Sequence, residues 1–450
     1  MTDQGCRAGA RCSSGLGAYS DRSRGGNTRT NTGASTWHPV GLSCPVTQEG
    51  SSLLQRPDDS CGRNQSVRSP GSWLPAVCDA SVTNVCNAAC DFCGFARDKG
   101  LAGPKRYMDA EDFARAIPFL RRRHVRYMTL QGGEPLVHPG IVRLVAEVAG
   151  AGMQAAIITN GWFLPRYIEP LAAAGLGRLV ISIDSANLGT HEYNRGLDGL
   201  TSRIKQGIRG AQARGIPVTA SVTVSRLVRY EDLAKTLWHL GFDGVEFSYP
   251  RQEALGSTSL VYGEGSHLVD LTRDELLEAL EAIRRLKKQF PVFNSMASLA
   301  EVGRFVRGEP QHVPCVGGYK YFYLDWNLDI WRCEAWPEKL GSVFDLDNIS
   351  DQRDPCNACM MGCYRNASML MHSGISATDA LAAVIGGDVT AAVAALFRRG
   401  VAMSLWTLIR EAPHIRRLTA RRTKSRGLKA AAADEPRAIM DEGQRPAEAD

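Results

Sequence analysis

Three cysteines with short, regular spacing, Cys86, Cys90 and Cys93, form the densest group of potential metal ligands in the chain. Thiolates are soft ligands that bind iron–sulfur clusters, Zn²⁺ or Cu⁺. A structural zinc site takes four protein ligands, usually from Cys-x2-Cys pairs. This run supplies three ligands, at x3 and x2 spacing. Because three ligands on a four-iron cube leave one iron open to a small molecule, the run predicts a [4Fe–4S] cluster, with a zinc or purely structural site as the alternative.

A glycine turn follows about 40 residues later, Gln131-Gly132-Gly133-Glu134-Pro135, at the end of the apolar run 127–130. Glycines allow a close approach of the backbone, and exposed carbonyls beside a carboxylate suit an ammonium group. On this interpretation, a bulky residue at Gly133 is expected to weaken ligand binding and to leave the cluster assembled. Loss of iron would instead indicate a structural turn.

The two motifs together resemble the radical S-adenosylmethionine (radical SAM) superfamily, which has the Cys-x3-Cys-x2-Cys loop, an aromatic residue before the third cysteine (here Phe92) and the Gly-Gly-Glu-Pro turn. The resemblance implies that the amino and carboxylate groups of S-adenosylmethionine bind the open iron. Reduction of the cluster then gives a 5′-deoxyadenosyl radical. It also implies that the cofactor-binding residues include Phe92 and the turn residues Gly132, Gly133, Glu134 and Pro135.

Ser182 and Asp184 alternate at the end of an apolar run, so both are expected on one face of a strand. Small polar side chains there can bond ribose hydroxyls or a carboxylate, and the resemblance implies this cofactor-binding role. The alternative is a strand-end serine followed by an aspartate that caps a helix. Arg195 can pair with a carboxylate in bidentate fashion or remain solvated.

Strand-length apolar runs alternate with amphipathic helical stretches up to about residue 250, and the glycines at 152, 175, 215 and 241 fall where helices should end. The predicted strands are 77–82, 127–130, 155–159, 179–183, 218–224 and 244–248, and the predicted helices are 109–123, 139–151, 163–175, 199–214, 230–240 and 272–289. Six such repeats predict an α/β fold, a partial (β/α)6 TIM-like barrel with its chemistry at the carboxyl ends of the strands.

The expected organisation is a disordered segment at 1–70, the barrel at 73–290, a small cysteine-rich extension at 310–366, C-terminal helices at 375–427 and a disordered tail at 430–450. The extension contains a second cysteine set and a hairpin-like stretch around the turn Asp325-Trp326-Asn327. The cysteines of this set are Cys315, Cys333, Cys356, Cys359 and Cys363.

This extension resembles the twitch domain, a shortened SPASM domain that binds one auxiliary [4Fe–4S] cluster. The resemblance implies that the five cysteines supply its ligands, with Cys315, Cys333, Cys356 and Cys359 as the favoured four and one cysteine spare. The family has a glycine five residues before the second cysteine, where this chain has Leu328, a departure that bears on the turn geometry. Zinc held by four of the five cysteines is the alternative.

Bulk properties limit the remaining classes. A net charge of +6 over 450 residues does not indicate nucleic acid. Residues 1–70 lack the apolar core of a signal peptide, and the cysteines cluster as ligand sets, so a reducing cytoplasmic location is expected. The basic apolar stretch 397–429 predicts either a cover helix with a solvated basic face, which is favoured, or a peripheral contact with an anionic membrane.

The predicted function is a radical SAM enzyme, oxidoreductase-like, that abstracts hydrogen from a small molecule such as an alcohol, a sugar or a lipid-like metabolite. A reducing electron donor such as flavodoxin or ferredoxin is implied. The alternatives are a maturase of a ribosomally made peptide, with thioether, carbon–carbon or epimerisation chemistry, and a non-enzymatic zinc-stapled binding protein.

Overall fold

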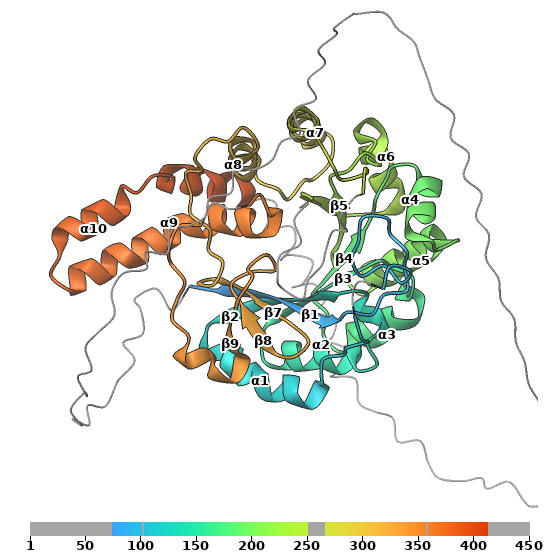
Figure 1. The fold of residues 1–450 in the computed structure, drawn as a ribbon, viewed down its shortest axis with the longest axis horizontal. Coiled ribbons are helices and arrows are strands. Elements are labelled where there is room, and N and C mark those ends of the chain that lie inside the picture. Colours follow the sequence, from blue (N-terminus) through green and yellow to red (C-terminus); the bar gives the residue numbers. More distant parts are fainter. Residues whose placement is uncertain (1–73, 101–102, 251–265, 357–358, 413–450) are drawn as a thin grey trace, which may run out of the picture. The chain divides into compact units, whose positions relative to one another are not determined.

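A computed structural model describes residues 74–100, 103–250, 266–356 and 359–412. Its centre is a nine-stranded sheet with the order β6-β5-β4-β3-β2-β1-β7-β8-β9 (Figure 1). The strands from β1 to β7 are parallel, and β8 and β9 add antiparallel to β7. The strands are β1 (Ala76–Thr83), β2 (Val125–Gly132), β3 (Gln154–Thr159), β4 (Arg178–Ser182), β5 (Val218–Thr223), β6 (Gly244–Ser248), β7 (Tyr321–Leu324), β8 (Asp329–Trp331) and β9 (Lys339–Ser342).

Helices from the β/α repeats cover one face of the sheet, and α9 and α10 follow the last strand and extend away from it (Figure 1). The helical elements, in chain order, are α1 (Ala110–Arg122), the 3-10 turn η1 (Pro135–Val137), α2 (Ile141–Gly150), α3 (Leu164–Ala173), α4 (Leu188–Arg195), α5 (Leu200–Ala213), α6 (Tyr230–Leu240), α7 (Arg273–Leu286), α8 (Met296–Val306), the 3-10 turn η2 (Val343–Asn348), α9 (Gly362–Ile385) and α10 (Val389–Leu396). Capping residues fix where several of these helices begin or end. Asp109 caps α1 by accepting from Glu111 N and Asp112 N, and Gly241 ends α6 in the left-handed conformation.

Side-chain alternation gives the sheet two different faces. In β1, Ala76, Cys78, Ala80 and Val82 join the main core with apolar residues of the covering helices. Asp79 and the other odd-numbered residues of β1 face the opposite side, because successive side chains of a strand alternate. The same alternation in the neighbouring strands makes this second side polar. We call it the polar face.

The six predicted β/α repeats are confirmed to within a few residues at each strand, and so is the α/β fold with C-terminal helices. Helix α8 was not predicted, and neither were two further features. Helix α4 lies between β4 and α5, and β7 pairs in parallel with β1, with Val77 opposite Tyr321. The extension therefore continues the barrel sheet. The predicted segments 1–70 and 430–450 lie outside the described residues.

The predicted hairpin of the extension is β7–β8, with Tyr323 opposite Trp331. Its turn contains Leu328 at φ 64°, one of two non-glycine residues with positive φ among those described. Leu328 therefore adopts the left-handed conformation that a glycine provides at lower cost. The side chain is buried, and Val343 N donates to Leu328 O at 2.9 Å. The backbone at this turn position is left-handed although the residue is not a glycine.

By length and composition, α9 is the one helix among the described residues that could cross a membrane, and 44% of its most apolar window is buried within the protein. Helix α10 and the helical residues Val401–Ala412 pass the same test only as a pair, and they are bent by 51° at the break between them.

Candidate functional site

The cysteine loop begins where β1 ends, and the glycine turn packs directly against it. Gly133 N donates to Thr83 O at 2.8 Å, and Glu134 N donates to Val85 O at 2.8 Å. A Cβ at Gly132 would lie 2.3 Å from Thr83 O, and one at Gly133 would lie 2.4 Å from Val85 O. The sequence attributed these glycines to approach of the cofactor. In the structure, a side chain at either glycine is excluded by the backbone of Thr83 and Val85, which leads into Cys86.

Glu134 is buried and accepts three hydrogen bonds. Oε1 accepts from Leu136 N at 3.0 Å and from Thr159 Oγ1 at 2.7 Å, and Oε2 accepts from Asn160 N at 2.7 Å. Burial raises the pKa of Glu134, and these hydrogen bonds oppose that rise. Asn160 Nδ2 in turn donates to Asn87 Oδ1 at 2.8 Å. Glu134 therefore ties the end of β3 to the cysteine loop, and Pro135 starts the buried turn η1 beside it.

Asp184 and Arg195, which the sequence treated separately, form one buried ion pair. Arg195 Nη2 donates to Asp184 Oδ1 at 2.5 Å, and Nε donates to Oδ2 at 2.8 Å. Asn194 Nδ2 donates to Oδ2 at 2.8 Å. Burial would raise the pKa of Asp184, but the Arg195 charge holds it well below its usual range. The solvated reading of Arg195 is wrong, because its side chain is only 12% exposed.

Helix α4 supports the cysteine loop through the segment that carries this pair. Ala89 N donates to Arg195 O at 2.9 Å, and Arg97 Nη2 donates to Gly196 O at 3.1 Å. Burial raises the pKa values of Cys86 and Cys90, and the Arg195 charge opposes part of that rise. Ser182, the last residue of β4 and two residues before Asp184, is half-buried opposite Ser221. Asp184 thus has its acceptors occupied by protein groups.

The loop presents three thiols that interact electrostatically with one another. Burial raises the pKa of Cys86 to about 12 and raises those of Cys90 and Cys93, and neighbouring thiols add to the rise at Cys86 and Cys90. Phe92, between the last two cysteines, is buried. Asn87 Nδ2 is buried with no hydrogen-bond partner among its surroundings in the described structure. Crowded thiols beside a cation and an unmatched donor fit an anionic cluster.

Four cysteines of the second set also influence one another. Burial raises the pKa of Cys333 to about 12, and the charges of Cys359, Cys315 and Cys356 add to the rise. The described residues contain no group of three or more His, Cys, Asp or Glu side chains close enough to share a single metal ion. In a four-iron cube each thiolate binds a different iron. The four thiols therefore do not have to be close enough to share one metal ion.

Cys363 has a different environment from these four. It is the second residue of α9, whose first residue packs on Phe247 O and Tyr249. The residue as a whole is partly open to solvent. Surrounding protein atoms still desolvate its thiol, and this burial, together with the carboxylates of Glu334 and Asp79, raises the pKa of the thiol well above the usual value. Cys363 therefore faces the polar face of the sheet.

The polar face carries a group of residues that the sequence analysis missed. Asp79 Oδ2 accepts from Tyr321 Oη at 2.7 Å, whereas its buried Oδ1 has no hydrogen-bond partner in the described part of the chain. Gln131 Nε2 donates to Glu334 Oε1 at 2.6 Å. Burial raises the pKa of Asp79 to about 6, and the side chains of Tyr321 and Thr129 oppose that rise. The alternating Cys-Asp-Ala-Ser-Val-Thr of β1 was the signal for this group.

The remaining polar side chains of this face are small or paired. Arg178 Nη2 donates to Glu246 Oε2 at 2.8 Å, and Thr223 Oγ1 lies 3.2 Å from Ser248 Oγ. Tyr364 stacks on Tyr321 with ring centroids 4.2 Å apart, and its buried hydroxyl has no partner among the described residues. Asp79 Oδ1 and Tyr364 Oη thus leave two unmatched polar atoms on one side of the sheet.

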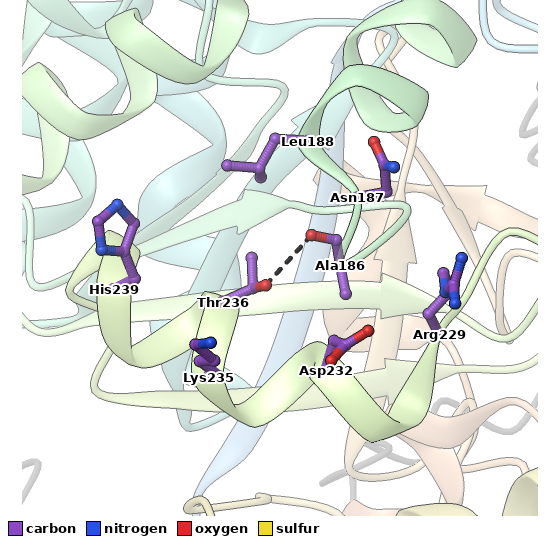
Figure 2. A pocket seen from close by; sticks show the side chains of 8 residues that line it. All are labelled: Ala186, Asn187, Leu188, Arg229, Asp232, Lys235, Thr236 and His239. Atoms are coloured by element: carbon purple, nitrogen blue, oxygen red, sulfur yellow. Dashed lines mark hydrogen bonds between the residues drawn. The ribbon is translucent and has the colours of Figure 1, made fainter.

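A separate surface hollow of about 540 Å³ lies between the start of α4 and helix α6 (Figure 2). Thr236 Oγ1 donates to Ala186 O across it at 3.1 Å, and Asp232 and Lys235 line its α6 side. Neither cysteine set nor the glycine turn contributes to its lining. We therefore assign it no part in the chemistry.

Comparison with known proteins agrees with the site. Residues 80–240 match the model of the radical SAM superfamily. The AdoMet-dependent heme synthase of Methanosarcina barkeri is 32% identical over 36% of this chain and 46% of that protein. The GTP 3′,8-cyclase of Campylobacter fetus is 28% identical over 49% of this chain and 67% of that protein. The chain spans about half the length of several curated relatives that it matches.

Two solved structures are similar to part of this chain at low sequence identity. Streptococcus suis SuiB bound to S-adenosylmethionine is 17% identical, with a TM-score of 0.47 over 62% of this chain and 67% of that chain. Native anSMEcpe with bound AdoMet is 13% identical, with a TM-score of 0.46 over 79% of this chain and 100% of that chain. The Cys-x3-Cys-x2-Cys loop and the glycine turn both lie inside the matched region, so residues 80–240 of the chain form a radical SAM domain.

Proposed function

We propose that this protein reductively cleaves S-adenosylmethionine at a cluster held by Cys86, Cys90 and Cys93, and that it acts on a polar small molecule bound against the polar face. When bound, the cluster and S-adenosylmethionine supply a 5′-deoxyadenosyl radical that removes a hydrogen atom from a C–H bond. The chain's own residues position this chemistry. Gly133 and Glu134 hold the loop on β1, and the Arg195 charge opposes the rise that burial gives the pKa of the Cys90 thiol.

The observation that carries the substrate class is the unmatched oxygen of Asp79. A buried acceptor without a partner is costly, so a ligand that donates a hydrogen bond or carries a cation gains by reaching it. The residues around it are hydroxyl- and carboxylate-bearing, which disfavours a lipid-like substrate and favours an amine or a polyhydroxylated compound. With a pKa near neutrality, Asp79 is suited to accept a proton from the substrate during oxidation.

The second cysteine set is proposed to hold an auxiliary [4Fe–4S] cluster. Cys315, Cys333, Cys356 and Cys359 supply four thiolates, which occupy all four irons, and Cys363 is the spare cysteine. A fully ligated cluster next to Glu334 is placed to accept an electron from a substrate-derived radical. Flavodoxin or ferredoxin is the proposed donor of the first electron.

The auxiliary cluster predicts an iron count. The anaerobically reconstituted wild type should hold about eight irons, as expected for two cubes. The triple variant Cys86→Ala/Cys90→Ala/Cys93→Ala should keep about half of that iron and remain coloured. If this variant is folded but binds only zinc, or holds no iron, the second set is a structural staple and its electron-accepting role is wrong.

The substrate class is tested by stimulation of 5′-deoxyadenosine formation. Amino sugars and polyols should raise the rate above the uncoupled rate of the wild type, whereas long-chain alcohols and short peptides should not. Asp79→Asn should keep the uncoupled rate and lose the stimulation, because its amide no longer offers a carboxylate oxygen to the substrate. Stimulation by peptides alone would favour the maturase alternative, and stimulation by long-chain alcohols alone would favour a lipid-like substrate.

A further inference from the structure

The C-terminal helices expose far more apolar surface than the rest of the protein. Ten of the sixteen large apolar side chains that are exposed in the described residues lie between Leu381 and Ile409. Seven of them belong to the end of α9, to α10 and to the residue after it, which Figure 1 shows as a helical hairpin. We call these seven the apolar tip: Leu381, Val384, Ile385, Val389, Val393, Leu396 and Phe397.

In the hairpin the small side chains lie between the helices and the large apolar side chains lie on the outside, which is unfavourable in water. The two helices meet through alanines, Ala380, Ala392 and Ala395 with Ala383 at the edge, in a cluster separate from the main core. The larger side chains point outward: Ile385 is 78% exposed and Phe397 is 84% exposed. In water the larger side chains would be the ones buried. Small residues between helices and large apolar residues outside are typical of helices that face lipid.

The apolar tip is almost uncharged, and the sequence that follows it is strongly basic. From Leu381 to Phe397 the sole charged residue is Asp388, and its side chain caps α10 by accepting from Ala391 N at 2.8 Å. From Phe397 to Lys429 the sequence carries ten Lys and Arg residues and one acidic residue, Glu411. Trp406 and Arg410, both exposed, stack with 4.9 Å between guanidinium and ring. An apolar tip followed by basic residues and an amphipathic tryptophan fits an anionic bilayer surface.

The other half of α9 limits how deep this contact can be. Tyr364, Arg365, Met369 and His372 are buried against the body of the protein, and Arg365 Nη1 donates to Val313 O at 2.8 Å. Ser404 Oγ donates to Met369 O at 2.7 Å, which ties the helical residues Val401–Ala412 to the same body. Helix α9 therefore cannot cross a membrane as a whole, because its first half is part of the folded protein.

We propose that the apolar tip inserts into the surface of an anionic membrane and holds the enzyme there, with the net positive charge of the sequence after Phe397 attracting it to anionic headgroups. This proposal does not depend on the proposed function. It replaces the cover helix as the reading of the C-terminal region.

The test is co-sedimentation of the full-length holoprotein with vesicles of phosphatidylglycerol and phosphatidylcholine or of phosphatidylcholine alone. The wild type should bind the anionic vesicles more strongly, and added salt should weaken that binding. Ile385→Glu and Phe397→Glu should each weaken binding about tenfold or more, because each replaces a side chain that the lipid would bury. Met296→Glu, which also replaces an exposed large apolar residue, is the matched control and should bind like the wild type.

Three outcomes would overturn the proposal. Unchanged vesicle binding by the Ile385→Glu/Phe397→Glu double variant would place the contact elsewhere. A dimer seen by light scattering, broken by Ile385→Glu and without vesicle binding, would mean that a second copy covers the apolar tip. A large drop in the unfolding temperature of Ile385→Glu without lipid would mean that another part of the chain covers it.

Discussion

Gly133→Ala should prevent assembly of the cluster at Cys86, Cys90 and Cys93. The added Cβ would lie 2.4 Å from Val85 O and 2.6 Å from Val85 C, closer than a Cβ can approach. Both contacts are to backbone, so the conflict cannot be relieved by moving a side chain. Val85 must shift, and Cys86 follows it directly. Iron content after anaerobic reconstitution should fall by the share of one cluster, about half.

The matched control for this prediction is Gly150→Ala in α2. No atom lies within 4 Å of the Cβ that would be added there, so this variant should hold wild-type iron. A Gly133→Ala protein with full iron and weakened S-adenosylmethionine binding would contradict the structural explanation. It would support the expectation from sequence alone, that the glycine admits the cofactor.

Arg195→Gln should destabilise the protein by about 3–5 kcal/mol and lower its iron content, because it leaves the buried carboxylate of Asp184 without its cation. The same change removes the charge that favours the Cys86 and Cys90 thiolates. Denaturant unfolding of the anaerobic holoprotein measures the loss of stability. The exposed pair Arg226–Glu275 is the control, and Arg226→Gln should cost no more than about 1 kcal/mol.

A double-mutant cycle separates the buried pair from general damage at this position. Arg195→Gln/Asp184→Asn has no unpaired charge, so it should be more stable than Arg195→Gln alone. Additive losses in the double variant would mean that the two residues act independently. The iron content of the double variant should stay below that of the wild type, because the cation beside Cys90 is still missing.

Local patterns were sufficient for the strands and for the cysteine loop, because alternation, helix ends and ligand spacing are properties of short segments. The pairing of β7 with β1 had no local signal, since Val77 and Tyr321 meet only in the folded chain. The partners of Asp184 were missed for a related reason. Asp184 was given a cofactor-binding role, whereas the bidentate carboxylate pairing expected as one possibility for Arg195 is made with Asp184 itself.

Asp79 shows a different limit of the sequence. An aspartate in a strand of mostly buried residues could be recognised in advance, but its unmatched oxygen depends on the positions of Tyr321 and Glu334, which come from the extension. Leu328 is a position where the sequence departs from the family pattern but the backbone conformation does not require a glycine. The sequence indicated an altered turn, yet the backbone takes the left-handed conformation with leucine.

The central claim is that the cluster held by Cys86, Cys90 and Cys93 cleaves S-adenosylmethionine. Its most direct test is the amount of 5′-deoxyadenosine that the anaerobically reconstituted, chemically reduced protein forms. The wild type should form it, and Cys90→Ala should form none. Cys78→Ala, which changes a buried cysteine in the core of β1, should form it as the wild type does. Wild-type amounts of 5′-deoxyadenosine from the Cys90→Ala protein would contradict the account.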